Sequence, residues 1–319
     1  MRFDVLDKKY IQEASQLAQA EYENASQVYG SLYKFKDISD FDSLIEGIFD
    51  AGQGLVAIED EKLVGYLAYY APIKDLFGYV EGAFSPLQGN AFGGKNRAKT
   101  ASLLFEETSK LLVKQGVLQY GVCLYANDTE MLESFSLNGF GYRCADGILD
   151  LQYELEIDKG LNVDFTELKS KEALKIYPLK SALLQHMADG PTYFPVGHES
   201  IADFEKALSE QNSRYFCASL SGKPIAYLEV TDEGETFLSN QSDYKHLCGA
   251  YLLIEYRGQG ILQSLLKFVA DTLKEEGVGK LGVDCETLNP SAYNFWRKYF
   301  HMYTYSLVRR LDERILINK

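Results

Sequence analysis

The chain repeats one pattern of segments twice along its 319 residues. In each half an amphipathic helical segment stops at a glycine, Gly116 in the first half and Gly277 in the second, and an apolar strand-like segment follows. An asparagine then precedes a short helical segment, Asn127 in one half and Asn289 in the other. The glycines lie 161 positions apart and the asparagines 162, so the register agrees within one residue. Because self-similarity at a fixed offset means that one structural unit is used twice, we expect two domains of similar fold.

The order of segments predicts the fold class. Each half reads β-α-α-β-β-β-α-β-α-β by the spacing of its apolar residues. This order predicts an α/β (α+β) protein of two lobes, each a mostly antiparallel mixed sheet flanked by helices. The apolar pattern is interrupted at Asp158-Lys-Gly160, which places the boundary near Glu156–Asn162. We therefore expect domains at 1–156 and 162–319, and this length suits two domains of about 150 residues each.

Composition excludes several classes of partner. A formal net charge of −14 argues against nucleic acid, because phosphate binding relies on clustered Lys and Arg, and it suits a cationic substrate such as an amine. The five cysteines form an odd set without CxxC spacing, which indicates a reducing compartment, and the four histidines show no metal-ligand spacing. The chain starts without a signal-peptide pattern and has no apolar run near the ~18 residues of a membrane span. We expect a cytoplasmic protein without a metal, a nucleic acid or a membrane partner.

The most informative motif joins a strand to a helix through a glycine turn. The segment Gly249–Leu262 runs from an apolar strand through Arg257-Gly-Gln-Gly260 directly into an amphipathic helix. Such a turn directs backbone N–H groups and the positive end of the helix at one point, which favours a phosphate or pyrophosphate. Glycine at 258 and 260 allows close approach of a bulky anion, and Arg257 adds positive charge. The spacing is neither the dinucleotide-binding fingerprint nor a Walker A loop.

Two motifs in this order resemble one known superfamily. Glu255-Tyr-Arg-Gly-Gln-Gly-Ile261 resembles the acyl-CoA pyrophosphate loop of the GNAT N-acetyltransferases. Asn289-Pro-Ser-Ala-Tyr-Asn-Phe-Trp-Arg-Lys298 resembles the next motif of that superfamily. The resemblance covers about 165–319, and the first half shares only the topology, so the chain is similar to a tandem GNAT protein with a degenerate N-terminal copy.

The resemblance implies that acetyl-CoA is the co-substrate. It also implies a set of residues that would hold it along the strand, the turn and the following helix: Leu252, Leu253, Ile254, Arg257, Gly258, Gln259, Gly260, Ile261, Leu262, Asn289 and Trp296.

Two carboxylates are candidates for the general base. Asp284 and Glu286 alternate along one expected strand and so face the same side, where a neighbouring carboxylate raises one pKa. A protonated amine must lose a proton before it attacks, which is the task of such a base. The alternative for this pair is a salt bridge or an exposed strand end. Glu229 and His246 are further candidates for the base.

The general acid departs from the pattern of the superfamily. Trp296 stands where the superfamily often has a tyrosine that protonates the departing thiolate, and an indole has no acidic proton to give. Tyr293 lies about one helical turn away and is the candidate substitute. The alternative is that the thiolate leaves with water or without a protein acid.

In the first half, the positions that match Gly258 and Gly260 hold Arg97 and Lys99, whose long side chains occupy the place of a close-approaching phosphate. We therefore expect this half to bind CoA poorly. The predicted activity is acetyl transfer from acetyl-CoA to a primary amine of a small molecule or peptide. The alternatives are a non-catalytic acyl-CoA-binding or regulatory protein and an aminoacyl transferase that uses charged tRNA.

Overall fold

The computed structural model describes residues 1–35, 39–156, 163–194, 197, 200–210 and 212–316. Contacts divide the chain into two compact units, Met1–Ala145 with Met302–Lys319, and Asp146–His301. Strand β7 (Gly141–Asp150) crosses this division. The sequence predicted a domain boundary at 156–162, and residues 157–162 lie outside the described part of the chain. The contacts place residues 146–156 in the second unit and residues 302–316 in the first unit.

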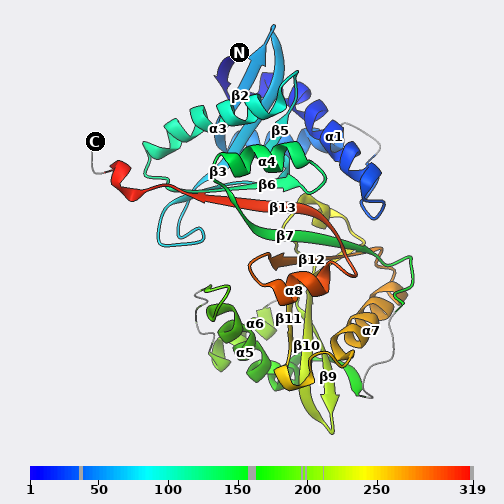
Figure 1. Ribbon diagram of the computed structural model, residues 1–319. Coiled ribbons are helices and arrows are strands. Elements are labelled where there is room, and N and C mark those ends of the chain that lie inside the picture. Colours follow the sequence, from blue (N-terminus) through cyan, green and yellow to red (C-terminus); the bar gives the residue numbers. More distant parts are fainter. Residues whose placement is uncertain (36–38, 157–162, 195–196, 198–199, 211, 317–319) are drawn as a thin grey trace. The chain divides into compact units, whose positions relative to one another are not determined.

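The first unit is a twisted mixed sheet with helices on both faces (Figure 1). All its neighbouring strands pair antiparallel except β4 with β6, which are parallel. The sheet runs in the order β1 (Arg2–Val5), β2 (Gln53–Glu59), β3 (Lys62–Ile73), β4 (Gly82–Ser85), β6 (Gln119–Tyr125) and β13 (His301–Arg310), with β5 (Asn90–Phe92) on β3. Its helices are α1 (Ile11–Val28), α2 (Ser39–Ala51), α3 (Arg97–Val113) and α4 (Thr129–Leu137).

Alternation along the strands separates two apolar layers in this unit. Tyr66 on β3 packs against Phe49 of α2, with ring centres 5.6 Å apart. Its neighbour Leu67 points to the other face and joins the core that includes Leu104 and Phe105 of α3. Because successive side chains of a strand face opposite sides, one strand serves both layers.

The last strand of the chain completes the sheet of the first unit. Along β13, Thr304 to Arg310 pair antiparallel with Tyr125 to Gln119 of β6. The chain therefore places the final strand of the second repeat in the sheet that holds the first.

The second unit has the same kind of sheet. From β12 (Lys280–Glu286), which also neighbours β7, its strands run to β11 (Tyr244–Leu252), β10 (Lys223–Thr231), β9 (Arg214–Leu220) and β8 (Asp164–Leu168). β11 pairs parallel with β12, and β8, β9, β10 and β11 pair antiparallel with one another in turn. Its helices are α5 (Tyr177–Ala188), α6 (Ile201–Glu210), α7 (Ile261–Glu275) and α8 (Pro290–Trp296). The predicted class, α/β with mostly antiparallel mixed sheets flanked by helices, is confirmed.

Helices cover both faces of this second sheet. Tyr215 and Tyr251 face α5 and α6, where they form a buried cluster with Phe204. Phe216, the next residue of β9, faces the other side and packs against Phe268 of α7 at 6.1 Å between ring centres. Helices α5 and α7 therefore lie on opposite faces of the sheet.

Helix α7 follows directly from its sequence. Its buried residues recur at helical spacing (Ile261, Leu265, Leu266, Val269, Ala270 and Leu273). Gly277 follows the helix with φ +89° and Val278 donates back to the carbonyl of Leu273 at 3.0 Å, a glycine-dependent way to end a helix. Among the helices that the structure describes, none is long and apolar enough to cross a membrane.

Candidate active site

The site begins where two parallel strands separate. The pairing of β11 with β12 runs from Tyr244 opposite Lys280 to Leu247 opposite Val283. Beyond this point β11 stays paired with β10 as far as Leu252, while β12 continues to Glu286 without pairing with β11. A bulge in β11 adds to the divergence, because the register with β10 shifts there and a bulge bends its strand. The strand ends thus face each other across a gap.

A cavity of about 460 Å³ fills this gap. Its wall comes from five places along the chain: β11, β12, the glycine turn with the start of α7, helix α5 with Phe194, and the segment that forms α8. The lining residues are Leu183, His186, Met187, Phe194, Leu247, Cys248, Gly249, Ala250, Tyr251, Leu252, Arg257, Gly258, Leu262, Gln263, Val283, Asp284, Cys285, Glu286, Asn289, Ser291, Ala292, Phe295 and Trp296.

The glycine turn gives one end of the cavity a backbone conformation suited to an anion. Gly258 has φ +77° and Gly260 has φ +75°, in the left-handed region that glycine adopts without strain. Gly260 caps the N-terminus of α7 without a side-chain hydrogen bond, so N–H groups of the first turn remain free for a ligand. A Cβ at Gly258 would meet no atom within 4 Å, so this side of the turn is open.

Arg257 is held in place beside this turn. Its Nε donates to the carbonyl of Leu252 at 3.3 Å, and its guanidinium lies 5.6 Å from the ring centre of Tyr251. The cation therefore lies over the ring of Tyr251, which faces α5, and its side chain lines the cavity close to the turn in sequence.

A hydrogen-bonded chain of three side chains leads away from the cavity. The carboxylate of Asp284 lies 2.8 Å from Nε2 of the buried His246, and Nδ1 of His246 lies 2.9 Å from the hydroxyl of Tyr244. An ionised carboxylate only accepts hydrogen bonds, so the bond to Asp284 needs a hydrogen on Nε2 of His246, and in that tautomer Nδ1 accepts from the hydroxyl of Tyr244. Burial raises the pKa of Tyr244, which keeps this hydroxyl protonated.

Two glycines leave the space that the side chains of Tyr244 and His246 occupy. A Cβ at Gly282 would lie 1.7 Å from the hydroxyl oxygen of Tyr244, and a Cβ at Gly234 would lie 2.8 Å from Nδ1 of His246. Burial also raises the pKa of the nearby Glu235, and the charge of Asp284 adds to this shift.

Glu229 belongs to a separate buried ion pair. Its carboxylate accepts from Nζ of Lys180 at 3.0 Å and from the hydroxyl of Tyr215 at 2.8 Å. The ammonium of Lys180 also lies 4.7 Å from the ring centre of Phe204. This carboxylate, a sequence candidate for the base, is therefore already neutralised by a cation.

The structure brings eight of the predicted site residues to the cavity wall: Leu252, Arg257, Gly258, Leu262, Asp284, Glu286, Asn289 and Trp296. Five others support the strand and turn or point elsewhere. Gln259 donates to the carbonyl of Glu255, Gly260 caps α7, Ile261 is fully buried, Leu253 packs on the apolar cluster below α5, and Ile254 is 67% exposed.

Tyr293 is placed differently from the carboxylates. It is half-buried on α8 and packs under the guanidinium of Arg297, 5.6 Å from its ring centre. Among the described residues that line the cavity, α8 contributes Ser291, Ala292, Phe295 and Trp296, and not Tyr293.

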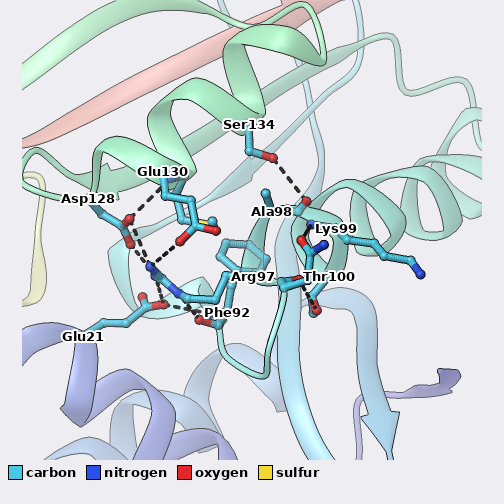
Figure 2. Close-up of polar contacts among 11 residues, drawn as sticks. Glu21, Phe92, Arg97, Ala98, Lys99, Thr100, Asp128, Glu130 and Ser134 are labelled. Carbon is cyan, nitrogen blue, oxygen red and sulfur yellow. Dashed lines mark hydrogen bonds and ion pairs between the residues drawn. The ribbon is translucent and has the colours of Figure 1, made fainter.

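The first unit fills the corresponding positions with its own side chains (Figure 2). Arg97, at the start of α3, pairs with Asp128, with Glu21 at 3.2 Å and with Glu130 at 3.3 Å, and its Nε donates to the carbonyl of Phe92 at 2.6 Å. Burial raises the pKa of Glu21 to about 7, even though the charge of Arg97 opposes the shift.

Side chains of the first unit also form hydrogen bonds at the start of α3 and at the place where β4 and β6 separate. Asn96 caps the helix by accepting from the N–H of Lys99 at 2.9 Å. Where β4 stops pairing with β6, at Ser85 opposite Val122, the buried amide of Asn90 donates to the carbonyl of Cys123 at 3.1 Å. The place of the cavity is thus taken by a hydrogen-bonded side chain.

Residues 182–302 match the family model described as the acetyltransferase (GNAT) family, so the chain carries a GNAT acetyltransferase domain in this segment. A search of curated proteins found no match.

Solved structures agree at the level of the fold. A GCN5-related N-acetyltransferase from Sphaerobacter thermophilus is similar with a TM-score of 0.60 and 12% identity, over 97% of this chain and 95% of that chain. A GCN5-related glucosamine N-acetyltransferase region of a fungal multi-domain GH3 β-N-acetylglucosaminidase is similar with a TM-score of 0.55 and 16% identity, over 96% of this chain and 38% of that chain.

Proposed function

We propose that this protein transfers an acetyl group from acetyl-CoA to a primary amine of a small molecule or peptide. The observation that carries the proposal is the cavity between the separated ends of β11 and β12. It has an anion site at the Gly258 turn and two carboxylates, Asp284 and Glu286, in its wall.

The described residues fit the donor in three parts. The pyrophosphate would accept hydrogen bonds from N–H groups of the glycine turn and of the first turn of α7, with Arg257 beside it. The pantetheine arm would lie along the free edge of β11 near Leu252, whose backbone groups beyond the β12 pairing face the gap. The thioester would then reach Asn289 and Trp296, which line the same cavity.

Asp284 is the base that the geometry favours. In our proposal its carboxylate takes the proton from the ammonium form of the acceptor, and the hydrogen bond from His246 holds it in place. The free amine then attacks the thioester carbon and a C–N bond forms. The nitrogen, now positively charged, loses its second proton to water, and the C–S bond breaks to give the amide and the thiolate. Glu286, on the same strand and in the same wall, attracts the cationic acceptor.

The departing sulfur also needs a proton. Trp296 has none to give, and Tyr293 does not line the described wall of the cavity. We therefore propose that the thiolate takes its proton from water, which is the second route that the sequence left open. Tyr293 stays a prediction that a Tyr293→Phe variant tests, since a normal rate excludes it as the acid.

The proposed donor site is tested by calorimetry with acetyl-CoA. Gly258→Asp places a negative charge at the proposed pyrophosphate site. Gly222→Asp is a matched control, because Gly222 has the same φ of +77° and equally open surroundings in the β9–β10 hairpin. Binding that is lost in the first variant and kept in the second supports the donor site. An absence of binding by the native protein refutes it.

Transfer itself is tested by the release of free thiol in the presence of amines. Binding of acetyl-CoA without thiol release for any amine refutes the transferase and leaves the alternative, a non-catalytic acyl-CoA-binding protein. For the first unit we propose that the Arg97 cluster and Asn90 leave no room for CoA, so that calorimetry gives one acetyl-CoA per chain.

A further inference from the structure

The cavity draws its wall from both faces of the sheet. Gly258 and Leu262 belong to the turn and helix of the α7 face. Leu183 and Met187 belong to α5, which packs on the opposite face. Because the sheet is open between β11 and β12, the cavity passes from one face to the other. A donor that is anchored at the Gly258 turn leaves the α5 side for the acceptor.

The α5 side is built from apolar side chains. Leu183 and Met187 lie one turn apart on the same face of α5. Phe194 joins them because the chain folds back after the helix, where its N–H donates to the carbonyl of Met187 at 2.8 Å. Phe295 and Trp296 complete the wall, with their rings edge to face at 4.9 Å.

Two polar side chains on this side, Asn289 and His186, contact each other. The amide of Asn289 lies 3.5 Å from Nε2 of His186 and 3.8 Å from the sulfur of Met187. Among the lining residues that the structure describes, the charged side chains are Arg257, over the ring of Tyr251, and the two carboxylates of β12, Asp284 and Glu286.

This distribution discriminates between kinds of amine. One ammonium group is matched by the carboxylates of β12. A second cation, or the hydroxyl groups of an amino sugar, would enter the apolar part of the wall and lose water without gaining a partner, which is costly. A hydrocarbon or aromatic group would gain from the same burial, and the unbranched thioether of Met187 adapts to such groups.

We propose that the acceptor is a primary amine carried on an apolar body, either alkyl or aromatic, that lies between α5 and α8. This inference rests on the proposed acetyl transfer and names the class of its acceptor. Polyamines and amino sugars are excluded as preferred substrates.

The test compares amines at saturating acetyl-CoA by the rate of thiol release. The apolar probes are 2-phenylethylamine and hexylamine, and the hydrophilic probes are spermidine, glucosamine and lysine. We expect kcat/KM to be about 100-fold higher for the apolar probes, the size of effect that apolar pockets produce over a few methylene groups. A hydrophilic probe that reacts as well as 2-phenylethylamine overturns this inference and leaves the transferase intact. Thiol release with none of the five amines overturns the transferase as well.

A pair of variants assigns the preference to the α5 wall. Met187→Gln keeps the length of the side chain and adds an amide to the apolar wall, so KM for 2-phenylethylamine should rise about 10-fold, the lower end of what apolar pockets discriminate. Binding of acetyl-CoA should stay unchanged, and Met187→Leu should restore the native KM. An unchanged KM in Met187→Gln, with acetyl-CoA binding intact, overturns the assignment to this wall.

Discussion

Removal of the guanidinium of Arg97 should destabilise the first unit strongly, with a pH dependence set by Glu21. Arg97 is 28% exposed at its side chain, and its partners Glu21 and Asp128 are 14% and 15% exposed, so the cluster is largely withdrawn from water (Figure 2). Arg97→Met leaves both carboxylates without their cation. Breaking a buried ion pair on one side costs about 3–5 kcal/mol of unfolding free energy, and we expect this loss at pH 8.

The loss should shrink at pH 5. Burial raises the pKa of Glu21 to about 7 from a model-peptide value of 4.5, so the folded state holds this proton more tightly than the unfolded state. Stability from this group is therefore present below about pH 4.5 and is lost as pH rises through 7. Without Arg97 the pKa of Glu21 rises further, because the cation had lowered it. At pH 5 the carboxyl is neutral in both proteins, and only the pairing with Asp128 and Glu130 is missing.

Urea unfolding at both pH values measures this difference. Far-UV circular dichroism is the signal to follow, because the single tryptophan, Trp296, lies in the other unit. Lys99→Met is the control, since Lys99 is exposed on the same helix and its loss should change stability by less than about 0.5 kcal/mol. A second variant, Glu21→Gln in the Arg97→Met background, should recover part of the loss at pH 8. A loss under about 1 kcal/mol, or equal losses at pH 5 and pH 8, would refute the reasoning.

Three further predictions concern the second unit and a control position. Asp284→Asn should lower kcat for acetyl transfer at least ~100-fold, the usual contribution of a general base, with acetyl-CoA binding unchanged in calorimetry; a kcat within twofold of native contradicts the assignment. Gly282→Ala forces a Cβ to within 1.7 Å of the hydroxyl oxygen of Tyr244. This overpacking should lower the free energy of unfolding by about 1–3 kcal/mol, measured by thermal unfolding, and lower the rate of acetyl transfer. Gly116 has open surroundings, so Gly116→Ala should leave the transfer rate unchanged. Cys248 is accessible, but desolvation by the groups around it raises the pKa of its thiol to about 12, so iodoacetamide at pH 8 should alkylate it at least ~10-fold more slowly than free cysteine. Alkylation as fast as that of free cysteine would contradict the last expectation.

The fold was predictable because its signals are local. The spacing of Leu265, Leu266, Val269 and Leu273 sets the buried face of α7, and Gly277 ends the helix through its positive φ. These patterns depend on neighbours within a few residues, so one chain contains all the information that they need.

The donor end of the candidate site was predictable for the same reason. Gly258 and Gly260 have the positive φ that their residue type suggested, directly before a helix whose start is free of side-chain caps. The acceptor side was not predictable. Leu183 and Met187 read as ordinary core positions of α5, and they line the cavity only because α5 packs beside the place where β11 and β12 separate.

The buried network around Asp284 shows the same limit. His246 is 38 positions away in sequence and becomes the partner of Asp284 because the parallel register sets Tyr244 opposite Lys280 and so brings the two strands together. Sequence spacing within one strand placed Asp284 and Glu286 on a common side, but it could not reveal this partner. Register between strands is set by packing and turns, not by the residues of one strand alone.

By itself, the sequence determined the class of fold, the duplication, the glycine turn that begins α7 and the carboxylate pair on β12, because each depends on residue type and short spacing. Tertiary structure decided which strand completes which sheet. The apolar alternation of β13 suits either repeat, yet its backbone pairs with β6 of the first unit. Tertiary structure also decided that the charge cluster of Arg97 fills one helix start while the other stays open. Both outcomes depend on groups far apart in the chain, whose meeting only the packed protein specifies.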